Sequence, residues 1–541
     1  MIGTLSYPSP SADPIQEEVR RPLSQVISDL FETNAAANTL MIFTIVIGFI
    51  HGWLKVKFRH PITTFAFDFP LVITMILVIM SKNRERLIPN SKIGDALKYH
   101  FILGLIYIPL SVLIWEMPIV AVLAAFRGWC VIPFAFVVGY HITTSIRQVE
   151  FYMWLVIILG FATALYGIQQ SIEDIRALMA ADPEMEYRFR NQFYSMNGKQ
   201  VFRKISTYVS SAVFAAQLSY SITFALARLS VKSCPMKERI IIGIMMATMA
   251  YALIETGSRT AVLQLGAAVL FTLIYRRGGI QLGIIPIIIF IVWKFLGSSV
   301  AETSADRYGT LMDSQTIFFR FWIVLVPSWE AFLDSPLGTG LGSSSHGLPM
   351  FLVFALVAAG KLRMIDGDLG HLVVDMGLPG LIILGNLLVK ACLESWHSMF
   401  RLRNTVMSII ALPAGLFFIE NIVAFPIGTP FLGIPYGVLI WFFLGALCRL
   451  NTDYKKLTES PDINTPIFNA KFTSFILKPQ IKSLFHTPDQ QSSTSDSSLN
   501  KFTNNKKYRT NFSANYPERA TESNKNIKRF LYFKPNKKTV Y

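Results

Sequence analysis

Charged residues are scarce in this chain. Asp, Glu, Lys and Arg make up 16% of its 541 residues, whereas soluble globular proteins carry roughly 25%. Hydrophobic residues make up 52%, including 42 phenylalanines. So little charge and so much apolar surface exclude a soluble globular protein, and the sequence predicts a polytopic membrane protein.

Cysteine is also rare. The four cysteines have neither paired nor metal-ligand spacing, so we expect no disulfide framework and no metal site. The polar N-terminal segment 1–33 carries acidic residues and lacks the basic start and apolar core of a cleaved signal peptide. The first span is therefore expected to remain as an uncleaved anchor.

Apolar runs of about twenty residues match the thickness of the hydrocarbon core. They predict an all-α, polytopic helical bundle of about twelve spans within residues 34–450. The expected spans lie near 38–54, 63–80, 100–116, 128–144, 151–168, 207–229, 239–256, 260–275, 279–297, 369–390, 405–422 and 430–449.

Loops that carry Lys and Arg stay in the cytoplasm. Basic loops near 82–98, 232–239, 276–277 and 390–403 mark that side. The alternate connections then face the periplasm, among them the corner at 255–259 and one large outer loop, 298–368. One connection disagrees with this scheme, because Lys55, Lys57 and Arg59 would face outward.

The C-terminal segment 451–541 is rich in Ser, Thr, Asn and Lys and cannot bury a core, so a disordered tail is expected. It holds 16 Lys and Arg against 7 Asp and Glu, an excess of nine out of the chain's net charge of +16. This charge suits a cytoplasmic segment beside anionic lipid. The basic composition therefore does not indicate nucleic-acid binding.

Arginines stand at the outer boundaries of the spans. Arg259 lies in the Ser-Arg-Thr corner between two apolar runs, where a buried charge costs about 3 kcal/mol unless function requires it. Arg307 and Arg320 of the outer loop carry donor forks that match phosphate oxygens. The alternative for both is that they anchor the protein at the membrane interface. Arg127 and Arg203 are further cations at span boundaries, and each is either such an anchor or a ligand contact.

Acidic residues and a histidine enter the next apolar run together. Asp366 and Asp368 precede it and His371 and Asp375 lie inside it, so a polar cavity is expected beside them. Asp366 and Asp368 have two possible roles. Each either accepts a proton in a reaction or serves the following helix as an N-cap or first-turn charge. His371 is a packing residue or a catalyst.

Three elements in order carry a resemblance to a known family. They are Ser258-Arg-Thr-Ala, then Arg320-Phe-Trp followed by Pro336-Leu-Gly-Thr-Gly-Leu-Gly, then Asp366 and Asp375-Met-Gly377. This order resembles the bacterial O-antigen ligase and O-antigen polymerase superfamily, with Arg203-Lys-Ile-Ser-Thr-Tyr as a further matching element. Asp366 stands where the ligases have a histidine, so the chain looks more like the polymerase-type members.

The resemblance implies an outer-face, metal-independent, inverting glycosyltransferase of surface polysaccharide biosynthesis in the bacterial inner membrane. Arg259, Arg320 and Asp366 would be catalytic. Arg203, Arg307, Asp368 and His371 would bind substrate, with no cofactor.

The partners implied are a polyprenyl-diphosphate-linked oligosaccharide donor, a glycan acceptor, the lipid bilayer and other polysaccharide assembly and export proteins, and no nucleic acid. Two alternatives stay open. One is a ligase that delivers finished glycan to a lipid or protein. The other is a flippase of lipid-linked sugars, although transporters usually show two related halves.

Overall fold

The computed structural model describes residues 35–58, 66–80, 91–143, 145–181, 192–196, 199–208, 210–230, 235–276, 314–344, 350–403, 407–426 and 428–459, with a few single residues between these ranges. The N-terminal segment 1–33, the expected span 279–297, Arg307 and the tail beyond residue 459 lie outside the described residues.

The described chain is helical apart from one short antiparallel hairpin. Its first helices are α3 (Ala35–Phe58), α5 (Asp68–Met80), α6 (Lys92–Leu113), α7 (Ile119–Phe126), the π-helical turn η1 (Arg127–Val131), α8 (Ile132–Ile142), α9 (Ile146–Gln169) and α10 (Ile172–Ala181). The hairpin pairs β1 (Phe193–Met196) with β2 (Lys199–Phe202). There follow α12 (Ser211–Leu229), α13 (Met236–Glu255), α14 (Arg259–Arg276), α17 (Ser314–Asp334), α18 (Met350–Ala358), α19 (Asp368–Arg401), α20 (Ser408–Ala424) and α21 (Tyr436–Glu459).

Six helical segments are long and apolar enough to cross a bilayer. They are Ala36–Phe58, Lys92–Leu113, Ile119–Ile142, Ile146–Gln169, Ser211–Leu229 and Asp368–Arg401. A helix of 24 residues rises about 36 Å, which exceeds the roughly 30 Å of the hydrocarbon core. These helices indicate a membrane protein, while the larger total of twelve spans stays a prediction.

Two regions differ from the expectations. The outer loop expected over 298–368 contains two helices, α17 and α18. The expected spans at 100–116 and 128–144 belong to helices that begin earlier, at Lys92 and Ile119. Arg127 does not interrupt the second of these, because the chain passes it in a π-helical turn and continues as α8.

Backbone-to-backbone contact holds α8 against α21. A Cβ on Gly139 would stand 2.0 Å from the carbonyl oxygen of Phe442, and one on Gly445 would stand 2.0 Å from that of Phe136. Small residues allow such approach between membrane helices, where packing and not the hydrophobic effect joins them. The glycines thus set this helix pair.

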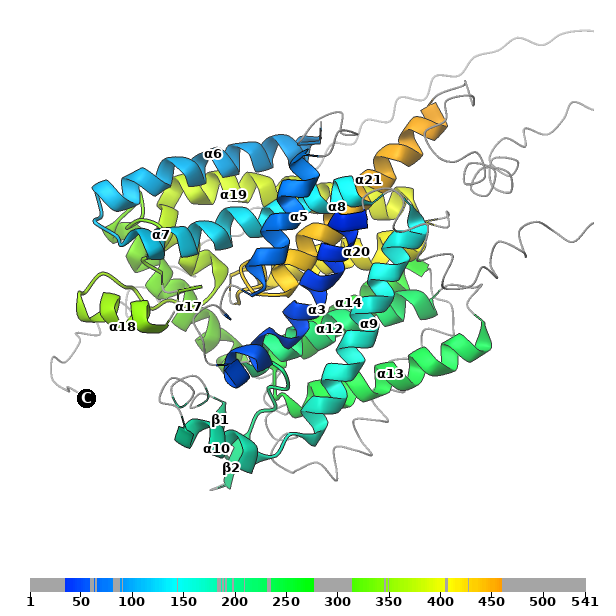
Figure 1. The fold of residues 1–541 in the computed structure, drawn as a ribbon, viewed down its shortest axis with the longest axis horizontal. Coiled ribbons are helices and arrows are strands. Elements are labelled where there is room, and N and C mark those ends of the chain that lie inside the picture. The colour runs from blue at the N-terminus through cyan, green and yellow to red at the C-terminus, as the bar shows by residue number, and fades with distance from the viewer. Residues whose placement is uncertain are drawn as a thin grey trace, which may run out of the picture. The chain divides into compact units, whose positions relative to one another are not determined.

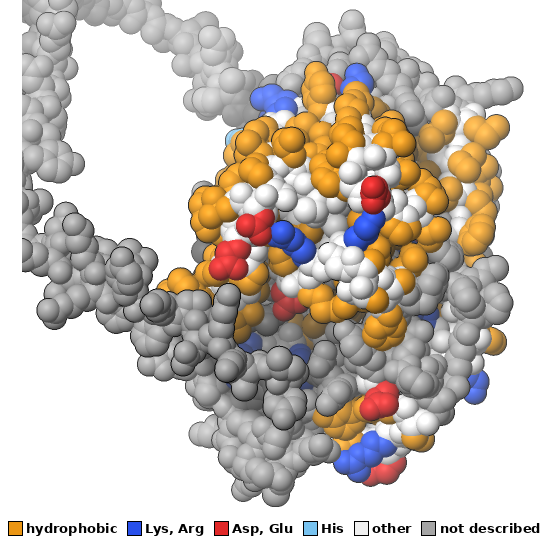
Figure 2. Space-filling view, turned by 90° about the vertical axis from the view of Figure 1, so that its left-hand side faces the viewer, with side chains coloured by type: hydrophobic (Ala, Val, Ile, Leu, Met, Phe, Trp, Pro, Cys, Tyr) orange, Lys and Arg blue, Asp and Glu red, His pale blue; other side chains and the backbone are white. Residues whose placement is uncertain are grey.

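Figure 1 shows α6 and α19 side by side, with α7, α17 and α18 gathered at one side of the bundle. Figure 2 views that side: hydrophobic side chains dominate it, and acidic and basic side chains lie close to one another. Two ion pairs of exposed side chains belong to this region, Lys361 with Glu116 at 3.2 Å and Arg363 with Asp334 at 3.1 Å.

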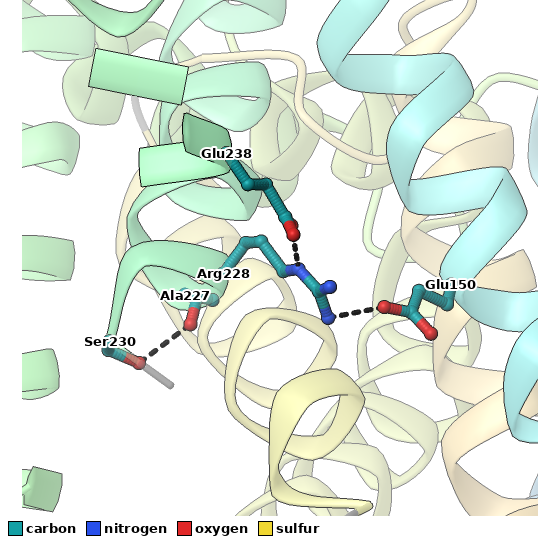
Figure 3. Close-up of polar contacts among 5 residues, drawn as sticks. All are labelled: Glu150, Ala227, Arg228, Ser230 and Glu238. Carbon is teal, nitrogen blue, oxygen red and sulfur yellow. Dashed lines mark hydrogen bonds and ion pairs between the residues drawn. The ribbon is translucent and has the colours of Figure 1, made fainter. Parts of the chain in front are cut away.

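Arg228 joins three helices at the other end of the bundle (Figure 3). From the last turn of α12 it donates through Nε to Glu238 of α13 at 2.6 Å, and its Nη1 donates to Glu150 of α9. The three side chains are 18 to 27% exposed. Because a guanidinium presents several donors in one plane, a single residue can hold both carboxylates.

The same end can be traced through the core. Ala227, Tyr275, Met399, Leu412 and Leu416 pack into one cluster. The cluster brings together the ends of α12, α14 and α19 and the start of α20. The starts of α12 and α14 and the end of α20 therefore lie at the opposite end, which carries the candidate site.

Replacing Arg228 with Ala should lower stability, because it removes the guanidinium that bonds both Glu150 and Glu238. A loss of about 1.5 to 3 kcal/mol is expected for hydrogen bonds to charged groups, reduced by the partial exposure. Thermal unfolding of the purified protein in detergent measures it. Lys361→Ala, which removes the exposed pair with Glu116, is the control and should cost less than about 1 kcal/mol; an equal or larger loss there would contradict the prediction.

Candidate functional site

The glycine-rich segment 336–344, here called the glycine loop, packs against a kink in α19. Gly377 has φ 55° and ψ −144° inside that helix, and a Cβ there would stand 2.2 Å from the Pro336 carbonyl oxygen. Leu378 N donates to that same oxygen at 2.8 Å, and Thr339 N donates to the Val374 carbonyl at 2.7 Å. Two elements from the family resemblance, Pro336-Leu-Gly and Asp375-Met-Gly377, thus contact each other directly.

Asp375 fastens the end of this segment. It accepts a hydrogen bond from the Ser344 main-chain N–H at 3.0 Å, another from the Ser344 hydroxyl at 3.0 Å, and a third from the Trp129 indole at 2.9 Å. His371, one turn earlier on α19, hydrogen-bonds the Ser344 main chain. Both side chains are at least 95% buried, so they position the loop.

The other wall of the loop comes from α6. The Tyr107 hydroxyl lies 2.9 Å from the Leu337 carbonyl oxygen and 3.0 Å from that of Met376. Leu341 N donates to the Ser111 hydroxyl at 2.8 Å. Irregular backbone among apolar helices needs such partners, because no water is present there to supply them.

The turn before α19 separates its two aspartates. Asp366 is exposed, whereas Asp368 is fully buried. Asp368 accepts from Phe431 N at 2.7 Å, and its own N–H donates to the Gly428 carbonyl at 2.7 Å. It ties α19 to the connection after α20 and does not face outward, so the expectation that Asp368 binds substrate has no support in this geometry.

Val324 of α17 lies against the turn that carries Asp366. Val324, one helical turn after Arg320 on α17, is fully buried. A Cβ added to Gly367 would stand 3.3 Å from the Cγ1 of Val324. Val324 therefore packs against Gly367, and Arg320 stands one helical turn before it on the same helix.

A second group forms at the corner between α13 and α14. The Arg203 Nε donates to the Thr256 carbonyl at 2.9 Å, three residues before the half-buried Arg259. The charge of Lys204 acts on Glu255 at the end of α13. Arg203, from a distant part of the sequence, thus bonds the corner at which Arg259 begins α14.

The two groups lie at the same end of the bundle. The core cluster described above makes α14 and α20 antiparallel, so Arg259 starts α14 on the side where α20 ends. Just beyond α20, the Pro426 carbonyl oxygen lies 2.7 Å from the place of a Cβ on Gly367. Arg203 and Arg259 therefore lie toward the same side as Asp366 and the start of α19.

Sequence reasoning missed some members of this region. Tyr107 and Trp129 hold the glycine loop and the Asp375 carboxylate, yet nothing in their sequence context distinguishes them from other aromatics of the spans. Arg127 pairs with Asp68 at 2.9 Å, so it is not a simple interface anchor. Among the described residues, no three His, Cys, Asp or Glu side chains lie where they could hold a metal ion together.

Comparison with known proteins adds no support to the family resemblance, which rests on these motifs alone. No protein-family model matches the chain, and no curated protein matches it significantly.

Replacing Gly377 with Ala should both destabilise the protein and displace the glycine loop. The backbone angles at this position cost a non-glycine residue about 1 to 3 kcal/mol, and the added Cβ overlaps the Pro336 oxygen. Thermal unfolding and limited proteolysis within 336–344 report the two effects. Gly385→Ala on the same helix is the control, because no atom lies within 4 Å of its Cβ position; equal behaviour of the two variants would refute this account of the kink.

Proposed function

We propose that this chain is an outer-face membrane glycosyltransferase. It polymerises or transfers polyprenyl-diphosphate-linked oligosaccharide in surface polysaccharide biosynthesis. The observation that carries the proposal is the contact between the glycine loop and the Asp375–Gly377 kink, beside a turn that presents Asp366. Two separate motif elements that suggested the family therefore meet at one end of the bundle, toward which Arg203 and the start of α14 at Arg259 also lie.

In the proposed reaction an acceptor hydroxyl attacks the anomeric carbon of the donor sugar. The bond from that carbon to the diphosphate oxygen breaks, and the polyprenyl diphosphate leaves with the electron pair. Arg259 and Arg320, with Arg203 beside Arg259, stabilise its developing negative charge. Preorganised donors of this kind are each worth about 2.7 to 4 kcal/mol. These guanidinium groups supply the charge that a metal supplies in other transferases.

Asp366 is the proposed general base. It takes the proton of the attacking hydroxyl, and its exposure at the start of α19 leaves it accessible to an acceptor. His371 is the alternative, since the ligases use a histidine. Its burial and its hydrogen bond to the Ser344 main chain favour a positioning role. An aspartate as the general base, in place of the histidine of the ligases, favours the polymerase over the ligase.

The orientation we propose places the candidate site in the periplasm and the opposite end in the cytoplasm of a bacterium. Arg228 and the C-terminal residues Arg276 and Arg401 of α14 and α19 belong to that opposite end. α21 reaches the same end, because Asn451 bonds Arg401 at 3.3 Å and Glu394 at 2.9 Å. Arginines at this end agree with the excess of Lys and Arg that cytoplasmic loops carry. The tail after α21 would then lie in the cytoplasm.

Arg259→Ala and Arg320→Ala should each lower glycan elongation at least about 100-fold, the loss typical of one missing transition-state donor. The amount of protein in the membrane should not change. Arg401→Ala, at the opposite end, is the control and should keep elongation within about twofold. Full-length polymer made by either site variant would refute the enzyme proposal.

The lipid-linked intermediates of a deletion strain separate the alternatives. Single repeat units held on the outer leaflet identify a polymerase. Long lipid-linked polymer identifies a ligase, and units trapped on the inner leaflet identify a flippase.

A further inference from the structure

The segment 203–208, between the hairpin and α12, contains a strained residue. Ser206 has φ 53°, and Glu116 is the only other non-glycine residue with positive φ among those that the structure describes. This backbone conformation costs a non-glycine residue about 1 to 3 kcal/mol, so it persists only where the surrounding structure fixes it, and it is often found near functional sites.

The side chain of Gln170 fixes the strained residue. Gln170 is the C-cap of α9 and has extended backbone angles, so the chain leaves the helix there. Its Oε1 accepts hydrogen bonds from Ile205 N at 3.2 Å and from Ser206 N at 3.1 Å, and its Nε2 donates to the Ser206 carbonyl at 3.4 Å. One amide side chain therefore bonds both main-chain groups of Ser206.

Two transmembrane helices hold the same segment. The Ser206 hydroxyl donates to the Thr163 carbonyl of α9 at 2.6 Å. Trp53 N of α3 donates to the Thr207 carbonyl at 2.7 Å. The segment 203–208 is thus attached to α3 and α9, although it forms neither helix nor strand beyond residue 202.

The first residue of this segment reaches the corner between α13 and α14. Arg203 Nε donates to the Thr256 carbonyl at 2.9 Å. Thr256 is the C-cap of α13, and its hydroxyl donates to the Leu253 carbonyl at 2.7 Å and accepts from Ser258 N at 3.2 Å. A cation is favourable at a helix C-terminus. Arg259 begins α14 directly after this corner.

We propose that Gln170 is a positioning residue for Arg259. This inference rests on the proposed function, in which Arg259 stabilises the departing diphosphate. Gln170 fixes the segment 203–208, Arg203 in that segment bonds the Thr256 carbonyl, and Thr256 caps the corner that leads into Arg259. Stabilisation of a developing charge requires a donor that is already in place, so a residue that touches no substrate can still set the rate.

Elongation by the purified protein, with lipid-linked repeat units extracted from the deletion strain, tests this role. Gln170→Ala should lower kcat about tenfold, because a small displacement of a catalytic group is costly. The KM should stay within about twofold, since Arg259 acts on charge that develops only in the transition state. Gln169→Ala is the matched control: it removes the same side chain one residue earlier, where it is exposed, and should leave kcat unchanged.

Gln170→Glu tests whether the hydrogen bonds carry the effect. A carboxylate keeps the oxygen that accepts from Ile205 N and Ser206 N, and the Lys204 ammonium, which donates to the carbonyl of residue 170, offsets the added charge. This variant should retain kcat within about threefold. A wild-type kcat in Gln170→Ala, or an equal loss in the Ala and Glu variants, would overturn the positioning role.

Hydrogen exchange, followed by mass spectrometry of the protein in detergent, tests the same connection without an activity measurement. Gln170→Ala should speed exchange of the Ile205 and Ser206 amides, which lose their acceptor, and also of the hydrogen-bonded amides 256–258 at the corner. Gln169→Ala should change neither. Faster exchange at 205–206 alone would overturn the proposal, because the displacement would then stop before Arg259.

The Arg259 variant separates the two levels of inference. Elongation retained in Arg259→Ala would overturn the proposed function and with it the positioning role. Elongation lost in Arg259→Ala but complete in Gln170→Ala would overturn the positioning role alone and leave the glycosyltransferase proposal standing.

Discussion

The contact between the glycine loop and the kink of α19 organises this end of the bundle. The polar main-chain groups of an irregular segment cannot lie among apolar helices unless each finds a partner. The Pro336 oxygen receives Leu378 N, the Val374 oxygen receives Thr339 N, and Tyr107 contacts two further carbonyls. The contact is possible because Gly377 lets the two backbones touch. The turn that carries Asp366 then begins a helix whose position this contact fixes.

Ion pairs lie at both ends of the bundle. At one end Arg228 lies between Glu150 and Glu238, so its charge is used within the fold. The ion pairs of Arg228 with Glu150 and Glu238 stabilise the packing of α9, α12 and α13. At the other end Arg127 pairs with Asp68.

The long apolar runs predicted an all-helical membrane protein, and six described helical segments are long and apolar enough to cross a bilayer. The same runs did not predict the π-helical turn at Arg127 or the kink at Gly377, since both depend on packing against distant elements: His100 bonds the Trp129 carbonyl at 2.7 Å, and the kink is filled by the glycine loop. The motif order singled out Asp375 and Gly377, and the structure shows both in contact with that loop. The motif order did not reveal that Asp368 is buried. Its carboxylate accepts a hydrogen bond from Phe431 N, which lies 63 residues away in the sequence.

Three aspartates near the start of α19 illustrate how environment, and not residue type, selects a chemical role. Asp375 accepts from Trp129 and Ser344 and is 1% exposed; a substrate could reach it only by displacing the loop. Asp368 is fully buried and already accepts from the Phe431 main chain. Asp366 alone among the three is exposed. A general base must come within about 3 Å of the hydroxyl that it deprotonates, and burial denies this to the other two. Under the proposed function, Asp366 is therefore the one of these three aspartates that an acceptor could approach.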